Sequence, residues 1–416
     1  MYVKFIGVVT RIFPMKFNEE VKVAFSMATA ALFTLIGYEF IRSSSTVLFK
    51  SAYGADKLPL VMAAMPVVVF FGVALYGWIL SQLGPRRTLL VSSLGSSMII
   101  LGCYLLVLGG NEMVTPALFL FKEFYIVLLI EQYWSYINSS VTPTTAKKVN
   151  GPVTGIAGIG GAIGGWMVGL SAESLGTETM VLCAAIALLP AALVANLTYL
   201  FHGEPDMPPA DKSQGHLALN LFRENKMLLS LLAVVLASQV IAAVLEFKFQ
   251  GILSEEYAGQ PDKETAFQGW FWGTLNTSVL LLQFVFAPLL LAFVSLRLVH
   301  LMMPLIHLAA ITVAIIEPTL LTVGVAFFLF KAFDYSIFRA AKEVLYVPLG
   351  FDERYRAKEV IDVFGYRTGK GGSSVVIAVL QRLGVVMANY YLAIGFVMAL
   401  VWLALVFPLT RTSDES

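Results

Sequence analysis

Charged residues are scarce in this sequence. Only 13% of its 416 residues are charged, whereas 58% are hydrophobic and the mean hydropathy is +0.79. Because a soluble domain carries roughly 25% charged residues, this deficit excludes an ordinary soluble protein. Apolar stretches of roughly 20 residues, the length needed to cross a bilayer, recur along the chain. The composition therefore predicts an all-α protein that crosses the membrane many times.

Cysteine and histidine are scarce too. The two cysteines, Cys103 and Cys183, lie in apolar segments, where a free thiol usually packs as a small hydrophobic side chain. The four histidines form no cluster. We therefore expect no disulfide, no metal site and no cofactor. The net charge of +1 gives no indication of a nucleic-acid partner.

The sequence carries no motif of an enzyme or an ATP-driven pump. The stretch FGYRTGKGGSSVV (364–376) comes nearest to a phosphate-binding loop, which requires Gly-x-x-x-x-Gly-Lys followed by Ser or Thr. Phe364 occupies the place of the first glycine, and Gly371 follows the lysine. The motif is therefore absent, and the cations Arg367 and Lys370 need another explanation within an apolar part of the chain.

Hydropathy predicts twelve membrane spans. A basic amphipathic segment, residues 1–22, precedes them and has no signal-peptide cleavage site, so we expect it to lie on the membrane surface. A polar linker, residues 202–226, separates the first six spans from the last six, and a short tail, residues 410–416, follows. The predicted spans are 23–41, 58–80, 88–108, 114–139, 151–171, 179–201, 227–249, 267–294, 298–316, 319–347, 360–381 and 387–409.

Lysine and arginine in the connections predict the orientation. If both termini lie in the cytoplasm, that side carries sixteen of these residues and the other side only four, namely Lys50, Lys57, Lys263 and Arg382. Cytoplasmic loops of membrane proteins are enriched in lysine and arginine. We therefore expect both termini to be cytoplasmic.

Short sequence matches relate the two halves of the chain at offsets of 207–211 residues. Such a repeat predicts two pseudo-symmetric six-helix bundles, residues 23–201 and 227–409. This is the plan of the major facilitator fold, whose substrate site lies near mid-membrane between the bundles. The matches are YEF (38–40) with LEF (245–247), FLFKEF (119–124) with FLFKAF (328–333), AKKV (146–149) with AKEV (357–360), and GIGG (158–161) with GKGG (369–372).

Charged residues inside the predicted spans are the candidates for function. A charge at the centre of a membrane helix costs roughly 2.5–3.5 kcal/mol, so such residues face one another or an aqueous cavity. Most lie in the first, fourth, seventh, tenth and eleventh spans, which predicts one shared cavity. The cations are Arg42, Lys122, Lys248, Lys331, Arg339, Lys342, Arg367 and Lys370, and the acids are Glu39, Glu123, Glu131, Glu246, Asp334, Glu343 and Asp362.

Two pairs of these charges have a structural explanation. Lys331 and Asp334 are three residues apart, and Arg339 and Glu343 are four apart. On an α-helix, residues at these spacings are neighbours and can form an ion pair. Each pair can therefore neutralise itself without any ligand.

Other charges have alternatives as well. Arg42 and Lys342 lie near span ends, from which a long side chain can extend to the membrane interface. Lys122 and Glu123 are attributed to an outer vestibule, and we assign them no function.

Glu131, Glu246 and Lys370 have no such explanation, and we predict that they face the cavity. Glu131 lies deep in its span with no cation one turn away. Lys370 stands in a Gly-x-Gly-Gly stretch, whose counterpart GIGGAIGG (158–165) is explained by close helix packing, since glycine lacks a Cβ. An ammonium group in such a place can hold a phosphate or a carboxylate.

The segment FDYSIFRAAKEVLYVPLGFDERYRAKEVIDVFGYRTGKGGSS (333–374) resembles the signature region of the ATP/ADP translocase family, the nucleotide transporters of intracellular bacteria and plastids. The specific resemblance covers these 42 residues, in which Arg339 replaces an aspartate of the family pattern. The matching positions are Tyr335, Ser336, Phe338, Lys342, Glu343, Tyr346, Pro348, Leu349, Asp362, Val363, Gly369, Lys370 and Gly372.

The resemblance also implies roles for single residues. Glu131 matches the family's glutamate in Glu-x-x-Trp of the fourth span, Glu246 matches its glutamate of the seventh span, and Lys370 matches its Gly-Lys-x-Gly lysine. The family's first-span lysine has no match, because Ser45 stands in its place, although the neighbouring Arg42 is kept. A missing cation should weaken the binding of a di- or triphosphate.

Taken together, these features predict a monomeric secondary active transporter in a bacterial cytoplasmic membrane, not an enzyme. Its expected cargo is an ATP/ADP-like nucleotide or a related anionic metabolite, moved by exchange or proton symport. The alternatives are proton-coupled transport of a non-nucleotide organic anion or siderophore-like solute, and a non-transporting membrane scaffold. The predicted substrate-binding residues are Lys370, Arg42, Glu131, Glu246, Arg367 and Lys342, and the predicted gating or proton-coupling residues are Glu131, Glu246, Asp334 and Glu343.

Overall fold

The computed structural model describes residues 19–204, 222, 225–347, 349, 358 and 360–410, and at 362–364, 367 and 368 it describes the backbone alone. Most of the predicted surface segment, most of the linker, nearly all of the C-terminal tail and the side chain of Arg367 therefore lie outside the described residues. Every element assigned within the described residues is helical, as predicted.

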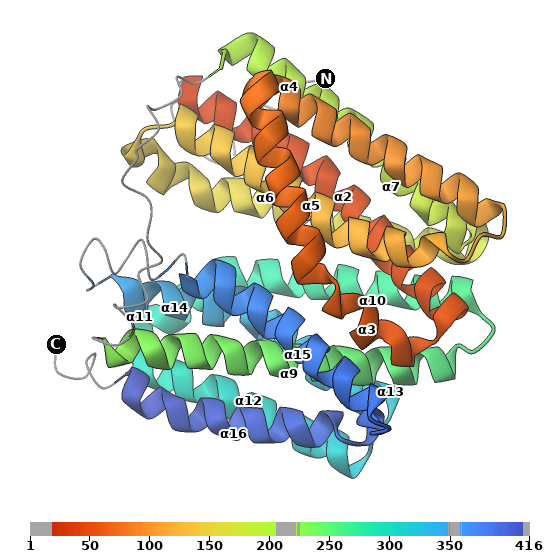
Figure 1. Cartoon of the computed structure of the whole chain (residues 1–416). Coiled ribbons are helices and arrows are strands. Elements are labelled where there is room, and N and C mark those ends of the chain that lie inside the picture. The colour runs from red at the N-terminus through yellow and green to blue at the C-terminus, as the bar shows by residue number, and fades with distance from the viewer. Residues whose placement is uncertain are drawn as a thin grey trace.

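The helices form two groups, which we call the N-terminal half (α2–α7) and the C-terminal half (α9–α16) (Figure 1). Elements η2, η3 and η5 are π-helical, and η1 and η6 are 3-10 helices. The N-terminal half contains α2 (Glu19–Tyr53), η1 (Ala55–Lys57), α3 (Leu58–Ala63), α4 (Met65–Leu108), α5 (Val114–Ser140), α6 (Pro143–Leu175) and α7 (Thr177–His202). The C-terminal half contains α9 (Lys226–Glu256), α10 (Pro261–Leu281), η2 (Leu282–Phe286), α11 (Ala287–Phe293), α12 (Leu296–Ile316), α13 (Leu320–Phe333), η3 (Asp334–Phe338), α14 (Arg339–Tyr346), η5 (Val360–Gly365), α15 (Tyr366–Arg382), η6 (Met387–Asn389) and α16 (Tyr391–Leu409).

Nine of the described helical segments are long and apolar enough to cross a membrane. One of them, α4, holds two of the predicted spans, because it bends at Gly84, whose φ of 73° leaves the helical range just before Pro85. The more polar α5 and the short α15, which continues from η5, provide the remaining two spans. The prediction of an all-α membrane protein with twelve spans is thus confirmed.

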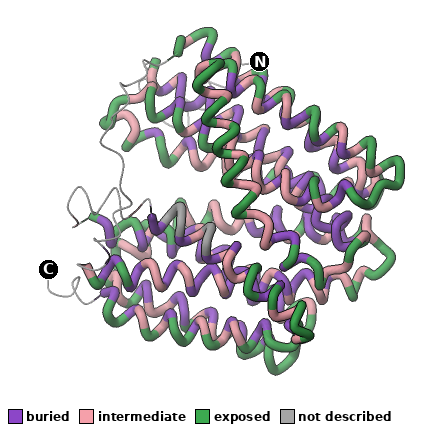
Figure 2. The backbone as a smooth tube through the Cα atoms, viewed as in Figure 1, coloured by how far each residue is buried: buried purple, intermediate pink, exposed green. Residues whose placement is uncertain are grey.

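Each half has a hydrophobic core of its own. One core consists of buried side chains between residues 21 and 199 together with Ala266, and the other of buried side chains between residues 222 and 409. The outer faces of both groups, by contrast, are largely exposed (Figure 2). Phe70 on α4 and Phe293 on α11 are 70% and 84% exposed. Apolar faces of this kind contact lipid, so the chain is a multi-pass membrane protein.

Helices α6 and α10 make the most extensive contact between the halves. Glycines lie at its closest points. A Cβ added to Gly165 would lie 2.4 Å from the backbone nitrogen of Gly273, and one added to Gly269 would lie 2.3 Å from that of Gly169. The packing explanation of GIGGAIGG is therefore confirmed, because any side chain at these positions would force the helices apart.

Candidate substrate cavity

A polar cavity lies where the two halves meet. About 430 Å³ of space free of protein atoms, open solvent at its mouth included, lies between its walls. Helices α2 and α5 line it from the N-terminal half, and α9, α10, α13, η3 and α15 from the C-terminal half. Its lining residues are Tyr38, Arg42, Thr46, Lys122, Glu123, Glu246, Gln250, Gln268, Trp272, Lys331, Tyr335 and Lys370.

The cavity wall is positively charged. Four cationic side chains line it against two carboxylates, and a third carboxylate, that of Glu39, lies 3.4 Å from the Arg42 guanidinium, which leaves an excess of one positive charge. In a site with little water, a fixed excess of this size attracts anions and repels cations. The charged members of the wall are Arg42, Lys122, Lys331 and Lys370, and the acids Glu123 and Glu246.

Glu246 and Lys370 form an ion pair in the wall of this cavity. The Lys370 Nζ lies 3.2 Å from the Glu246 Oε2, and the two side chains are 28% and 20% exposed. Glu246 comes from α9 and Lys370 from α15. The sequence singled out both residues but did not predict that they neutralise each other.

Arg42 lies on the opposite wall, against an aromatic ring of the other half. Its guanidinium carbon lies 3.2 Å from the centre of the Trp272 ring, which is a close cation–π contact. The guanidinium also lies 3.4 Å from the Glu39 carboxylate, which in turn accepts a hydrogen bond of 3.0 Å from Asn276. The alternative in which Arg42 extends to the membrane interface is therefore wrong.

Lys122 and Glu123 also belong to the cavity wall, although the sequence analysis assigned them no function. The Lys122 ammonium donates a hydrogen bond of 2.8 Å to the Thr46 hydroxyl and lies 3.7 Å from the centre of the Phe119 ring. The Glu123 carboxylate lies 3.9 Å from the same ammonium. The side chain of Lys122 is buried.

Lys331 does not form the helical ion pair with Asp334 that was considered above. Its ammonium lies 3.4 Å from the Tyr335 hydroxyl, while the buried Asp334 Oδ1 has no hydrogen-bond partner among the described residues. The π-helix η3 begins at Asp334. A π-turn changes the angle between successive side chains, so the spacing rule of a regular α-helix no longer applies there.

Arg339 and Glu343 do not pair with each other either. The Glu343 carboxylate lies 2.6 Å from the Lys358 Nζ and is partly exposed. Lys342 is buried, with its ammonium 4.7 Å from the centre of the Tyr366 ring, so it does not extend to the interface. Asp334, Lys342 and Glu343 are all absent from the cavity wall.

Glu131 lies away from the cavity as well. It is exposed on α5, eight residues after Glu123. Eight residues of α-helix rise by roughly 12 Å and turn the side chain by roughly 80°. The expected convergence of three charges is therefore met by Glu246 and Lys370 but not by Glu131.

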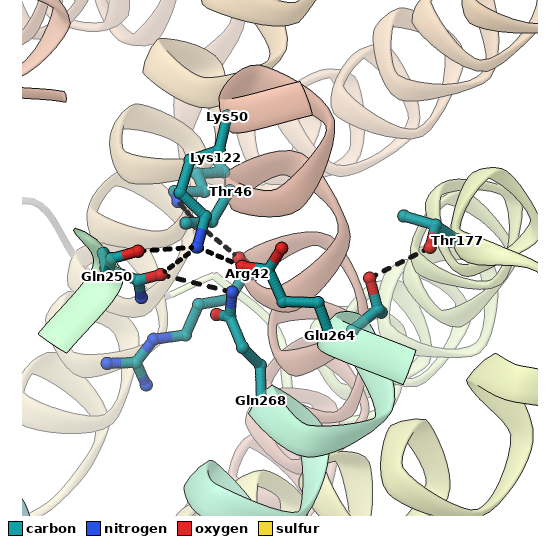
Figure 3. Close-up of polar contacts among 9 residues, drawn as sticks. Arg42, Thr46, Lys50, Lys122, Thr177, Gln250, Glu264 and Gln268 are labelled. Carbon is teal, nitrogen blue, oxygen red and sulfur yellow. Dashed lines mark hydrogen bonds and ion pairs between the residues drawn. The ribbon is translucent and has the colours of Figure 1, made fainter. Parts of the chain in front are cut away.

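A buried polar cluster adjoins the cavity (Figure 3). The Lys50 ammonium forms an ion pair with Glu264 and donates a hydrogen bond of 2.6 Å to the side-chain oxygen of Gln250. Gln268 donates a hydrogen bond of 3.4 Å to the same oxygen. Because Gln250 and Gln268 also line the cavity, this cluster lies between the cavity and the ends of α2 and α10 that carry Lys50 and Glu264.

Further contacts join the halves at the same end. The Asp262 carboxylate accepts hydrogen bonds of 2.7 Å from the backbone and the hydroxyl of Thr177, and Gln381 donates one of 3.1 Å to the carbonyl of Asp56. Every polar contact between the halves whose two partners are described lies at this end or at the level of the cavity. The halves are thus tied together on one side of the cavity.

The sequence did contain a signal for two of the missed residues. Lys122 and Lys331 occupy the same position in FLFKEF and FLFKAF, the best match of the internal repeat. Both line the cavity. A charge that a repeat keeps in both halves is a candidate for a shared central site. Tyr38, Gln250, Gln268 and Trp272 had no comparable signal, because tyrosine, glutamine and tryptophan are common in membrane helices for other reasons.

Comparison with known sequences supports the resemblance. Residues 266–412 match the sequence model of the TLC ATP/ADP transporter family. A segment of 78 residues is 33% identical to the ADP,ATP carrier protein 1 of Rickettsia bellii and 32% identical to that of Rickettsia conorii. Each alignment spans 18% of this chain and 16% of the relative.

Comparison with solved structures concerns the fold. The nucleoside transporter NupG superimposes with a TM-score of 0.62 at 14% identity, over 96% of this chain and 100% of that chain. A POT family peptide transporter superimposes with a TM-score of 0.64 at 14% identity, over 96% of this chain and 97% of that chain. A bacterial homologue of the iron transporter ferroportin superimposes with a TM-score of 0.65 at 11% sequence identity, over 94% of this chain and 98% of that chain. The resemblance seen in the sequence is thus confirmed: residues 266–412 match the TLC ATP/ADP transporter family model, within a chain whose fold is that of major facilitator-type transporters.

Proposed function

We propose that this protein is a secondary active transporter that moves a nucleotide or a related anionic metabolite through the central cavity by alternating access. The observation that carries the proposal is the cavity itself, enclosed between two repeat-related halves and lined by four cations against two carboxylates. The matched Rickettsia proteins are named ADP,ATP carriers, which supports a nucleotide as the cargo.

In this proposal, Lys370 and Arg42 bind the anionic part of the substrate. Lys370 is paired with Glu246 in the unloaded cavity, so an arriving phosphate or carboxylate competes with Glu246 for the ammonium. Arg42 is positioned by Trp272 and Glu39 and presents a planar guanidinium that suits bidentate contacts. Glu246, once released from Lys370, is the group of this cavity that is placed to hold a coupling proton.

The charge of the cavity favours exchange over one-way movement. Closing both ends around an excess positive charge removes it from water, which is costly without a partner. A bound polyanion offsets that charge, so the loaded protein changes conformation more readily than the empty one. An exchanger needs this behaviour, because it changes sides only when it carries a substrate.

We place the protein in a bacterial cytoplasmic membrane with both termini in the cytoplasm, as the distribution of lysine and arginine predicts. The end closed by Lys50 and Glu264 then faces outward. In this orientation the structure corresponds to a state that exchanges substrate with the cytoplasm.

A second candidate is the proton-coupled transport of a non-nucleotide organic anion. Ser45 favours it, because the resemblance implies a lysine at this position for binding a di- or triphosphate. Ser45 is fully buried and absent from the cavity wall. An anion with fewer charges than ATP needs fewer cations, and the four of the cavity are then sufficient.

Transport by the purified protein in proteoliposomes tests the proposal. Vesicles preloaded with unlabelled ATP or ADP should take up labelled nucleotide, and Lys370→Ala should abolish the uptake. Lys263→Ala is the matched control, because this lysine is exposed in the first turn of α10 and does not line the cavity. Proton flux driven by an organic anion, without nucleotide uptake, would favour the second candidate. No transport of any offered solute would favour a membrane scaffold.

A further inference from the structure

Two lysines related by the internal repeat face the cavity from opposite halves. Lys122 of α5 and Lys331 of α13 take the same place in FLFKEF (119–124) and FLFKAF (328–333). Both are buried, at 2% and 5% exposure, and both line the cavity. The repeat therefore presents one ammonium group from each half to the same space.

The surroundings of the two lysines differ in one respect. Lys122 is followed by Glu123, whose carboxylate lies 3.9 Å from its ammonium, and it also donates a hydrogen bond to Thr46. In the second half the corresponding residue is Ala332. The substitution removes a carboxylate from the neighbourhood of Lys331.

The other two cations of the cavity also have acidic partners. Arg42 lies beside Glu39, and Lys370 forms its ion pair with Glu246. No carboxylate lies within ion-pair distance of the Lys331 ammonium among the residues that the structure describes. Glu246 is close enough to attract Lys331 electrostatically, but Lys370 holds it.

The groups in direct contact with Lys331 are aromatic and neutral, whereas the carboxylates of Glu246 and Asp334 act on it only from beyond ion-pair distance. Its ammonium lies 3.4 Å from the Tyr335 hydroxyl, 5.2 Å from the centre of the Tyr335 ring and 5.7 Å from that of Phe327. These contacts compensate only part of the cost of burying an ammonium group. The site is electrostatically incomplete, and a ligand anion in the cavity would complete it.

We propose that Lys331, with the Tyr335 hydroxyl beside it, is a further binding site for a phosphate or carboxylate group of the substrate, in addition to Lys370 and Arg42. This inference rests on the proposed function, because it names the subsite within the transport cavity. Lys122 faces the same anion from the N-terminal half. A ligand that contacts both lysines joins the two halves and so stabilises the closed states of the cavity over the open ones.

The alternative is a structural role, in which Lys331 positions the π-helical turn η3 through Tyr335. A structural lysine would affect folding and thermal stability but would leave the affinity for anions unchanged. Binding measurements on folded protein separate the two roles.

Direct binding to the full-length protein in nanodiscs, by isothermal titration calorimetry, tests the proposal. The probes are ATP, ADP, inorganic pyrophosphate and citrate. Lys331→Gln should weaken the binding of whichever probe binds the wild type by roughly ten- to a hundredfold, the effect of losing a charged contact. Lys331→Arg should retain most of the affinity. Glu123→Gln should tighten binding severalfold, because it removes a competing carboxylate from the wall.

Lys248→Gln is the matched control, because Lys248 is a half-buried lysine of α9 that does not line the cavity. The Lys248→Gln variant should bind each probe with the affinity of the wild type. Unchanged affinity of a folded Lys331→Gln variant for a probe that the wild type binds would overturn the inference and leave the transporter proposal intact. If the wild type bound citrate or pyrophosphate but neither ATP nor ADP, a nucleotide cargo would be ruled out. The effect of Lys331→Gln on the probe that does bind would still test the inference. Binding of no probe to the wild type would overturn both.

Discussion

Lys50 of α2 and Glu264 of α10 form an ion pair that joins the two halves of the protein. Their side chains are 0% and 5% exposed, and Gln250 accepts two further hydrogen bonds from the same ammonium, at its side-chain oxygen and its carbonyl. In a transporter that alternates between two states, this contact has to break whenever the cavity opens at this end. The pair is therefore part of the energy difference between the two states.

Removal of one partner should open this end of the protein. Breaking a buried ion pair costs about 3–5 kcal/mol, because the remaining charge stays buried without its partner. Lys50→Met and Glu264→Gln should both shift the population toward the state that is open at the end carrying this ion pair. Spin labels at Glu112, in the loop between α4 and α5, and at Glu317, in the loop between α12 and α13, should report a longer distance in both variants.

The control for this prediction is Lys57→Met. Lys57 belongs to the same end of the molecule, but its ion pair with Asp56 is exposed, and such pairs contribute little. The distance between the two spin labels in Lys57→Met should match that in the wild type. The prediction is wrong if the distances in Lys50→Met and Glu264→Gln also remain at the wild-type value.

The glycine contact between α6 and α10 gives a second prediction. Gly165→Ala places a methyl group 2.4 Å from the backbone of Gly273, where no flexible side chain can move aside. We expect a loss of about 1–3 kcal/mol of stability, as for overpacked cores, measured as a lower temperature of thermal unfolding in detergent. Gly102→Ala in α4 is the matched control, since its added methyl group would meet no atom within 4 Å. An equal unfolding temperature for both variants would contradict the prediction.

The features that the sequence predicted well depend on composition and spacing along the chain. Long apolar runs specify spans whatever their neighbours are, and the glycines of α6 indicate close packing because no other residue permits it. Glu246 and Lys370 were found because a charge in a membrane helix is costly and so requires an explanation. None of these inferences required the direction of a side chain.

The features that the sequence did not reveal depend on the direction in which side chains point. Glu131 lies deep in its span, but the turn of α5 places it on a different face from Lys122. The expected pair of Lys331 and Asp334 fails because η3 is a π-helix, and hydrophobicity patterns do not reveal a π-turn. Trp272 approaches Arg42 from the other half, and a contact between distant segments has no local signature.

Ser45 provides a third prediction. Its side chain is fully buried, and its hydroxyl has no hydrogen-bond partner within the part of the chain described. Restoring the family's lysine with Ser45→Lys would therefore bury an unpaired ammonium group outside the cavity wall. We expect the variant to lose roughly 3 kcal/mol or more of stability and to gain no affinity for ATP.

Ser45→Ala is the control for size and polarity, and it should unfold within a few degrees of the wild type. The relevant measurements are thermal unfolding and ATP binding of each variant. A Ser45→Lys protein of normal stability that binds ATP more tightly would show that residue 45 contacts the substrate after all.

The ion pair of Glu246 and Lys370 gives the fourth prediction, in which two variants act in opposite directions. Glu246→Gln removes the carboxylate that competes with the substrate for Lys370, so we expect a lower KM for the transported anion. Tighter binding also slows release, so the maximal rate should fall. Lys370→Gln removes an anion ligand and leaves Glu246 to repel the substrate, so its KM should rise steeply. Counterflow in proteoliposomes measures both constants.

A charge swap separates this role from a purely structural one. Glu246→Lys combined with Lys370→Glu keeps the pair and the net charge of the cavity, so thermal stability should approach that of the wild type. Transport should not recover, because the ammonium then projects from α9 instead of α15 and a carboxylate occupies the place from which Lys370 would bind the anion. If the swapped protein transported at the wild-type rate, the pair would serve the fold alone. Competition between Glu246 and the substrate would then have no part in the transport cycle.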